Sequence, residues 1–506
     1  MQKYKQNLKQ KVSIIGAGFS GISAAAYLAR QGYKVDVFEK NAEAGGRARQ
    51  FTTPEGFVFD MGPSWYWMPG VFEKFFDDFG YRSSDFYQLQ LLDPSFEMVF
   101  GNNETLVIPA DFKELCKLFD SIETGGSSKL KRFMSEGELK YRLGMEDLVY
   151  KPSLSITEYF TSSIIRNSLR ADLFLSFSRH VRKYFSDPRL IALMEFPVLF
   201  LGARPTQIPA LYSLMNYAGL KLGTWYPIGG FGKVIAAMKN VAEENGAEFH
   251  VNAEVEKIIV GNRLASGVKI NGTSIFSDGI VAAADYHHVE ESLLSWKDRN
   301  YQHNYWKKKI LAPSCLIFYL GINKTVKRLH HHTLFFDQDL KQHSYEIYTE
   351  PQWPSNPLFY ACCPSKTDST IAPVGHENIF LLMPIAAGLN DDDETRQKYF
   401  SVMIKRLEEF VKEPIQPNIV FKKSYCVNNF VEDYHSYKGN AYGLANTLLQ
   451  TAILKPKIKN RKLKNLFYAG QLTVPGPGVP PSIISGRIAA GLLSKYLAKK
   501  KDEVVV

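Results

Sequence analysis

A glycine motif near the start of the chain has the residue types and the spacing of a turn that binds a dinucleotide. An apolar run of strand length, residues 12–15, leads into the sequence GAGFSG at residues 16–21, and small and apolar residues then recur at helical spacing. In such a turn Gly16 permits the sharp bend, Gly18 lets the backbone approach a pyrophosphate, and Gly21 lets the helix pack closely on the strand. Free amides at the start of the helix would face the phosphates. The segment therefore predicts a strand, a turn and a helix that bind a dinucleotide.

The residues after the second expected strand indicate which dinucleotide binds. Residues 34–38 read as a strand that ends at Glu39, about 20 residues after the glycines, where a carboxylate would accept the ribose hydroxyls. An acid at this place favours FAD or NAD over NADP, whose ribose carries an additional phosphate. The sequence EAGGRAR at residues 43–49 then offers a second backbone approach and, in Arg47, a fixed cation for the pyrophosphate. An ordinary turn would explain these glycines, but it explains the arginine less well.

A second glycine motif lies at the opposite end of the chain. Residues 465–469 have strand character and end at Gly470, and the loop QLTVPGPGVPPS at residues 471–482 leads into a helix of small residues. A stiff loop that leads into the start of a helix presents backbone amides and the positive end of the helix dipole. This arrangement suits the electron-rich edge of a reduced flavin. The two motifs together favour FAD over NAD.

Composition excludes some classes of protein and leaves others open. The chain has 506 residues, 45% of them hydrophobic and 22% charged, which is typical of a soluble globular protein with more than one lobe. No apolar run approaches the ~20 residues of a membrane-spanning helix, and no secretory signal is recognisable. The net charge of +10 is compatible with nucleic acid, an anionic membrane or an acidic partner, but no nucleic-acid-binding module accompanies it. We therefore expect no nucleic-acid partner.

The cysteines and histidines do not indicate a metal centre. The five cysteines are scattered, which fits a reducing cytoplasm. Residues 330–332 are three consecutive histidines, but adjacent residues of a strand point to opposite faces. We therefore expect no metal.

Two apolar stretches could contact an apolar ligand or a membrane. The aromatic segment at residues 57–69 fits a buried structural loop and a ligand lining about equally. Over residues 155–217 aromatic and apolar residues recur at roughly helical spacing between arginines. A basic amphipathic helix of this kind can lie in a membrane interface. The pattern alone favours a helix that faces the core and exposes a basic side to solvent.

Over almost its whole length the chain resembles the bacterial phytoene desaturase family, within the amine-oxidase-like flavoproteins. The resemblance is carried by the motifs at residues 16–21, 59–64, 225–230, 329–336, 364–368, 468–470 and 475–480. It implies an α/β fold with a Rossmann-type FAD-binding domain, a discontinuous mixed α+β substrate domain and a helical region that contacts the membrane. The implied segments are residues 1–100, 223–300 and 456–506 for the FAD domain, 101–222 for the helical region and 301–455 for the substrate domain.

The resemblance also implies an activity and a set of contacts. The expected reaction is stepwise dehydrogenation of the C40 hydrocarbon phytoene to lycopene, with FAD as the only cofactor and oxygen or a quinone as the electron acceptor. The enzyme would lie on the inner face of the cell membrane. The expected FAD contacts are Gly16, Gly18, Phe19, Ser20, Gly21, Glu39, Lys40, Gly46, Arg47, Gly62, Pro63, Ser64, Val255, Asp285, Gly470, Gln471, Gly478, Val479 and Pro480. The expected substrate channel is lined by Trp65, Trp67, Met68, Phe196, Phe200 and Trp225.

Such a reaction needs little from catalytic side chains, because the cofactor supplies the difficult chemistry and the protein supplies orientation. The sequence does not identify a general base, and Asp60 and Arg204 are the candidates. A 1′-hydroxycarotenoid 3,4-desaturase, a carotenoid isomerase or another flavin oxidase would share nearly all the cofactor residues. From a different class, the same architecture can serve as a non-enzymatic binder of prenylated proteins, for which a decayed flavin site would be expected.

Overall fold

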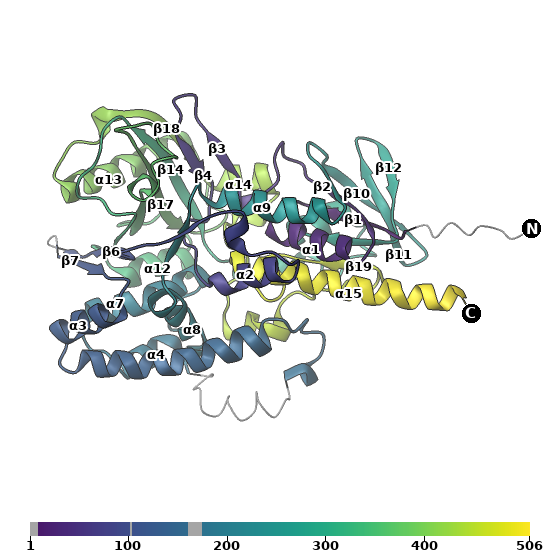
Figure 1. Cartoon of the computed structure of the whole chain (residues 1–506), viewed down its shortest axis with the longest axis horizontal. Coiled ribbons are helices and arrows are strands. Elements are labelled where there is room, and N and C mark those ends of the chain that lie inside the picture. The colour runs from purple at the N-terminus through teal and green to yellow at the C-terminus, as the bar shows by residue number, and fades with distance from the viewer. Residues whose placement is uncertain (1–8, 102–103, 160–174, 506) are drawn as a thin grey trace, which may run out of the picture.

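The computed structural model describes residues 9–101, 104–159 and 175–505, without the side chains of residues 146, 147, 200, 501 and 503–505. Its elements form two lobes, each built on a large sheet, and a layer of helices beside them (Figure 1). None of the helices within these ranges is both long and apolar enough to cross a membrane.

The first lobe is built on a parallel sheet to which both ends of the chain contribute. Its strand order is β19-β13-β1-β2-β9, with all neighbours parallel. Three long helices, α1, α9 and α15, belong to this lobe (Figure 1). The strands are β1 (Lys11–Ile15), β2 (Lys34–Phe38), β9 (Ala247–His250), β13 (Gly279–Ala282) and β19 (Leu466–Tyr468), and the helices are α1 (Phe19–Arg30), α9 (Phe231–Glu244) and α15 (Val479–Val505).

Glycines let α1 approach its neighbours closely. A methyl group at Gly21 would lie 1.9 Å from the carbonyl oxygen of Gly16, so only glycine allows the helix to start against the turn. A methyl group at Gly486 of α15 would lie 2.2 Å from the carbonyl oxygen of Ser20 in α1. The first and last helices of the chain are thus in backbone contact.

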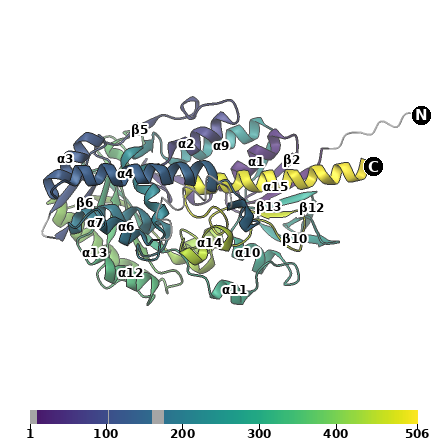
Figure 2. The same ribbon diagram turned by 90° about the horizontal axis from the view of Figure 1, so that it is seen from below.

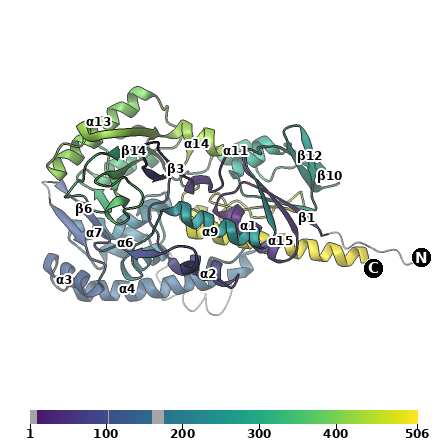
Figure 3. The ribbon, with the colours of Figure 1, turned by 45° about the horizontal axis from the view of Figure 1, so that its top comes forward.

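The second lobe is built on a seven-stranded mixed sheet of order β18-β14-β17-β16-β15-β6-β7. Alternate residues of its central strands face two different cores, because side chains of a strand alternate between faces. Leu316 and Phe318 of β14 pack with α13, which lies along the outer face of the sheet (Figure 3), whereas Ile317 and Tyr319 belong to the main core. The elements are β6 (Phe96–Val99), β7 (Thr105–Ile108), β14 (Ser314–Ile322), β15 (His332–Phe335), β16 (Phe359–Cys362), β17 (Glu377–Ile385), β18 (Ile419–Tyr425), α12 (Leu340–Tyr348), α13 (Asp393–Val411) and α14 (Val427–Tyr434).

Smaller elements complete the fold. A three-stranded antiparallel sheet and two short ribbons flank the lobes, and the helical layer lies below them (Figures 1 and 2). The strands are β3 (Gln50–Thr52), β4 (Val58–Asp60), β5 (Leu89–Leu91), β8 (Trp225–Pro227), β10 (Val255–Gly261), β11 (Leu264–Ile270) and β12 (Thr273–Phe276). The helices are α2 (Pro69–Asp77), α3 (Phe112–Ile122), α4 (Gly126–Arg142), α6 (Phe177–Arg182), α7 (Pro188–Glu195), α8 (Leu214–Asn216), α10 (Tyr286–His288) and α11 (His303–Lys307).

The α/β fold with a Rossmann-like sheet and a mixed substrate-lobe sheet agrees with the expectation from the sequence. The expected segment boundary at residue 100 falls between β6 and β7, which pair with each other as a hairpin. This hairpin is part of the second sheet, because β6 also pairs with β15. Most of the aromatic and basic pattern of residues 155–217 lies outside the described residues, at 160–174. In the described part, Phe177 and Val181 of α6 are fully buried, so this helix faces the core.

The contact between α1 and α15 generates a testable prediction. Substituting Gly486→Ala places a methyl group against the backbone of α1 and should lower the free energy of unfolding by about 1–3 kcal/mol, the usual effect of overpacking. Gly491→Ala in the same helix is the matched control, because a methyl group there meets nothing within 4 Å. Thermal denaturation of both variants measures the difference. Equal melting temperatures would contradict the close packing.

Candidate active site

A cavity of about 900 Å³ lies between the two lobes and receives residues from both ends of the chain. Its lining includes the first glycine turn, the segment 45–48, the segment 62–65 and the C-terminal loop 474–482. Nearly all the residues expected to contact FAD therefore lie along one cavity. They are Gly16, Gly18, Phe19, Ser20, Glu39, Lys40, Gly46, Arg47, Gly62, Pro63, Ser64, Val255, Asp285, Gly470, Gln471, Gly478, Val479 and Pro480.

Gly21 lies outside this lining. It packs against Gly16, so its role in the fold is to bring the helix close to the turn.

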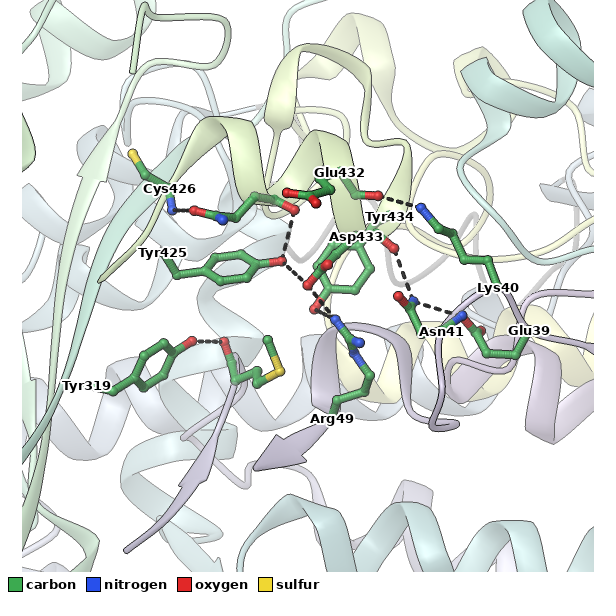
Figure 4. Close-up of polar contacts among 12 residues, drawn as sticks. Glu39, Lys40, Asn41, Arg49, Tyr319, Tyr425, Cys426, Glu432, Asp433 and Tyr434 are labelled. Atoms are coloured by element: carbon green, nitrogen blue, oxygen red, sulfur yellow. Dashed lines mark hydrogen bonds and ion pairs between the residues drawn. The ribbon is translucent and has the colours of Figure 1, made fainter. Parts of the chain in front are cut away.

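Glu39 holds the glycine turn in place at one end of the cavity. Its carboxylate accepts a hydrogen bond of 2.9 Å from the amide of Ala17 and one of 3.0 Å from the amide of Asn41. Asn41 in turn donates to the carbonyl of Asp433 in α14, and Lys40 donates to the carbonyl of Glu432 (Figure 4). The acid that would bind a ribose is thus buried and fixed by its neighbours, with lone pairs left for further donors.

Arg47 is a partly buried cation that forms no ion pair with the described residues. Its Nη2 donates to Ser436 Oγ at 3.0 Å and to the carbonyl of Asn440 at 3.2 Å, and its guanidinium lies over the ring of Tyr434. Its buried Nε has no hydrogen-bond partner, and no carboxylate of the described residues lies within ion-pairing distance of it. Burial lowers the pKa of Arg47. A buried guanidinium with an unsatisfied donor fits an anionic ligand such as a pyrophosphate.

The space above Gly18 also fits such a ligand. Gly18 has φ of −77°, which any residue adopts, and a methyl group there would meet only the Cα of Gly46, at 3.9 Å. The protein itself therefore does not require glycine at this position, whereas close approach of a phosphate to the backbone does.

The C-terminal loop lies along the same cavity. Gly470, Gly476 and Gly478 have φ of 113°, 141° and 110°, a region that favours glycine, and α15 starts directly after them. Pro480 and Pro481 have no N–H, so the amide of Val479 and the positive end of the helix dipole would meet the electron-rich edge of a flavin. These donors, Arg47 and the gap at Gly18 fit FAD, which when bound accepts a hydride.

The other half of the cavity is largely apolar and aromatic. Trp65 and Phe196 line it with ring centroids 5.8 Å apart, and Trp67 and Met68 lie beside them. Trp225 lies outside the lining and donates to the carbonyl of Leu222, and the side chain of Phe200 is outside the described residues. Alternation along the second sheet places Leu334, Ile317 and Leu382 on this wall.

The two candidate bases do not line the large cavity. Asp60 accepts hydrogen bonds from the amides of Phe231 and Gly232 at the start of α9 and from Gln50 Nε2, so it fixes that helix. Burial raises its pKa to about 6. Asp60 lines a separate chamber of about 20 Å³, while Arg204 lines neither space.

The sequence missed Tyr360, whose hydroxyl lies 3.1 Å from Ser64 Oγ and 2.6 Å from His332 Nδ1 on the cavity wall. Its position follows from period-two alternation in β16, but the sequence did not show that this face borders a cavity. The expectation that adjacent histidines point to opposite faces was wrong for His331 and His332, whose ring centroids are 4.4 Å apart. The alternation of a strand does not apply to this pair, because β15 begins only at His332.

Comparison with known proteins gives three findings. Residues 19–494 match the family model of flavin-containing amine oxidoreductases. The chain is 37% identical to a carotenoid 3,4-desaturase of Haloarcula japonica, over 97% of this chain and 99% of that protein. It is 29% identical to a zeta-carotene-forming phytoene desaturase of Myxococcus xanthus, over 96% of this chain and 94% of that protein.

A solved structure supports the fold alone. The cyclohexylamine oxidase of Brevibacterium oxydans superimposes with a TM-score of 0.58 at 14% identity, over 97% of this chain and 100% of that one.

The gap at Gly18 generates a prediction about cofactor binding. Gly18→Ala should weaken FAD binding about tenfold or more, a loss of about 1.4 kcal/mol, because the methyl group occupies the space of the phosphate. The melting temperature of the apoprotein should stay within about 2 °C of the parent value, since the protein atoms leave room for the methyl group. Flavin fluorescence titration and thermal denaturation measure the two effects. A large loss of apoprotein stability with unchanged FAD affinity would refute the assignment.

Proposed function

This chain belongs to the flavin-containing amine oxidoreductase family as an FAD-dependent carotenoid desaturase, and we propose that it introduces the 3,4 double bond near one end of a carotenoid. The observation that carries this choice is the identity of 37% to the Haloarcula japonica enzyme over nearly the whole of both chains. A 1′-hydroxylated carotenoid is the first substrate to test.

The cavity supports this chemistry through orientation and exclusion of water. Trp65, Trp67 and Phe196 give an apolar wall for a polyene, with their rings inclined to one another, and the glycine turns would hold the cofactor at the other end. Bound FAD supplies the hydride acceptor. The chain's own residues position the substrate carbons and keep the apolar half dry, which favours transfer of the hydrogen over side reactions.

Conversion of phytoene to lycopene, which the sequence favoured, is the second candidate. It is supported by the identity of 29% to the Myxococcus xanthus phytoene desaturase over a similar length. It ranks second because the identity to the 3,4-desaturase is higher.

The substrate choice is tested with purified, FAD-loaded protein and carotenoids in liposomes. A 1′-hydroxylated, already desaturated carotenoid should lose two hydrogens, seen as a red-shifted absorbance and a matching mass change, while phytoene should remain colourless. Formation of the lycopene spectrum from phytoene would favour the second candidate. A changed isomer with unchanged mass would indicate an isomerase, and protein that takes up no FAD would favour the binder of prenylated proteins.

We further propose that one end of the cavity opens at a membrane surface. Leu148, Ser153, Tyr159, Leu448 and Ala452 line this end. Two exposed chain segments meet there, since Lys457 Nζ donates to the carbonyls of both Ser153 and Ile453. Exposed apolar side chains surround this end, and we call them the apolar rim: Leu154, Ile156, Ile310, Leu448, Leu449 and Leu454.

The occupant that fits the apolar rim is an anionic lipid bilayer. Leu449 is 79% exposed, and Gln450 next to it holds Ile310 in place with hydrogen bonds of 3.0 and 2.9 Å to its backbone. The exposed Lys307 and Lys308 lie close to Ile310 in sequence and would meet lipid phosphates. A carotenoid is dissolved in the bilayer, so an entrance at the bilayer surface shortens the path of the carotenoid from the lipid into the cavity. The sequence indicated a membrane-contacting region at residues 155–217, which includes Ile156 of the rim, whereas half of the rim comes from residues 448–454.

Membrane binding is tested by the double substitution Leu449→Asp and Leu454→Asp, two rim residues that do not line the cavity. Each leucine that enters lipid contributes about 1.5–3 kcal/mol, so binding to phosphatidylglycerol vesicles should fall more than tenfold in a sedimentation assay. Val374→Asp is the control, because Val374 is fully exposed elsewhere in the second lobe. Activity on detergent-solubilised carotenoid should be retained in both variants. Unchanged vesicle binding of the double variant would overturn this proposal.

A further inference from the structure

We propose that Tyr360 and His332 form the acceptor for the proton that the carotenoid loses during desaturation, with Tyr360 facing the substrate and His332 behind it. This inference rests on the proposed function, since it assigns half of the same reaction to side chains of this protein. Desaturation breaks two C–H bonds on neighbouring carbons. One hydrogen leaves with its electron pair to FAD, and the other leaves as a proton while its bonding electrons form the new double bond.

Tyr360 lies where the cofactor half of the cavity meets the apolar half. In β16 it shares the cavity face of the second sheet with Leu382 of the neighbouring strand, with which it pairs directly. Its single hydroxyl proton can be donated to Ser64 Oγ, at 3.1 Å, or to Nδ1 of His332, at 2.6 Å. Ser64 follows Gly62, where a methyl group would come within 2.6 Å of the carbonyl of Arg47. The hydroxyl is therefore tied to the segment that continues directly from the cofactor site.

His332 is a neutral base with one nitrogen left free. Its ring is fully buried and stacks on Trp65 at a centroid distance of 4.0 Å and an angle of 11°. Its Nδ1 lies 2.6 Å from the hydroxyl of Tyr360, and its buried Nε2 has no hydrogen-bond partner. Burial, and to a smaller extent the neighbouring His331, holds the pKa of His332 well below its usual value. An unsatisfied buried nitrogen costs about 1–3 kcal/mol, so its presence calls for an explanation.

The proton transfer needs only these two side chains. The carbon-bound proton moves to the oxygen of Tyr360 as the hydroxyl proton moves to Nδ1 of His332, which leaves neutral tyrosine and an imidazolium. The leaving proton sits next to a carbon that becomes electron-poor as the hydride departs, so it is strongly acidic and a weak base suffices.

A small chamber lies next to the pair of strands that carries His332. This chamber of about 20 Å³ is lined by His331, Cys362 and Asp60, and Cys362 pairs with His332 across the two strands. Its volume suffices for about one water molecule. Asp60, whose pKa is raised to about 6 by burial, also lies on the chamber wall.

Another histidine on the cavity wall is a poor alternative. His343 has both ring nitrogens engaged: Nδ1 accepts from the amide of Leu358 at 3.0 Å, and Nε2 donates to the carbonyl of Pro384 at 2.9 Å. It would have to lose a hydrogen bond to accept a proton.

The inference is tested with Tyr360→Phe and His332→Gln in anaerobic single turnovers that follow bleaching of the flavin. Both variants should reduce FAD about 100-fold more slowly or worse, the usual contribution of a general base, while the dissociation constants of FAD and of the carotenoid stay within about twofold. Tyr399→Phe is the matched control, because the buried hydroxyl of Tyr399 donates a hydrogen bond of 2.7 Å to the carbonyl of Pro354. Tyr399 belongs to α13, on the other face of the sheet.

A second measurement does not depend on turnover. In histidine-labelled protein at neutral pH, ¹⁵N NMR should show His332 as a neutral ring, with the Nδ1 resonance shifted in Tyr360→Phe. A doubly protonated His332 would overturn the inference. The inference would also be overturned if the Tyr360→Phe variant reduced FAD within about threefold of the parent rate. The same holds if its carotenoid affinity fell by the same factor as its rate of FAD reduction. If the parent protein reduces FAD with none of the carotenoids, the proposed function fails and the inference fails with it.

Discussion

The structure depends on backbone contact between the two ends of the chain. Strand β1 pairs with β13, which pairs with β19, and α1 touches α15 where Gly486 meets Ser20. This contact brings the first glycine turn and the C-terminal loop to one cavity. A side chain at Gly486 would push α15 away from α1. The cofactor site therefore depends on the close contact between these two helices.

The cavity between the lobes contains polar groups that the protein leaves unsatisfied. Within the described residues, Arg47 forms no ion pair and has a buried Nε without a hydrogen bond, and His332 carries a buried nitrogen without a hydrogen bond. Leaving such groups unpaired lowers stability. Binding of an anionic cofactor at Arg47 removes one of these costs, which couples loading of the cofactor to the stability of both lobes.

The second sheet separates packing from chemistry by alternation alone. Residues such as Leu316, Phe359 and Leu381 pack against α13 on the outer face, while Ile317, Tyr360 and Leu382 face the main core and the cavity. One set of strands thus supplies both a stable core and a substrate wall. Substitutions on the outer face should therefore act on stability, and those on the inner face on the substrate.

The sequence by itself determined the Rossmann-like lobe and most of the expected cofactor residues, because glycine turns, strand ends and helix starts are local features with strong backbone requirements. It also indicated the family and an apolar lining of the cavity at Trp65, Trp67 and Met68. Only the tertiary structure decided that Asp60 fixes α9 outside the large cavity and that Trp225 lies away from it. It alone brought Ser64, His332 and Tyr360 together, from three segments far apart in the chain. Contacts of this kind depend on how sheets pair and lobes pack, which local sequence patterns do not encode.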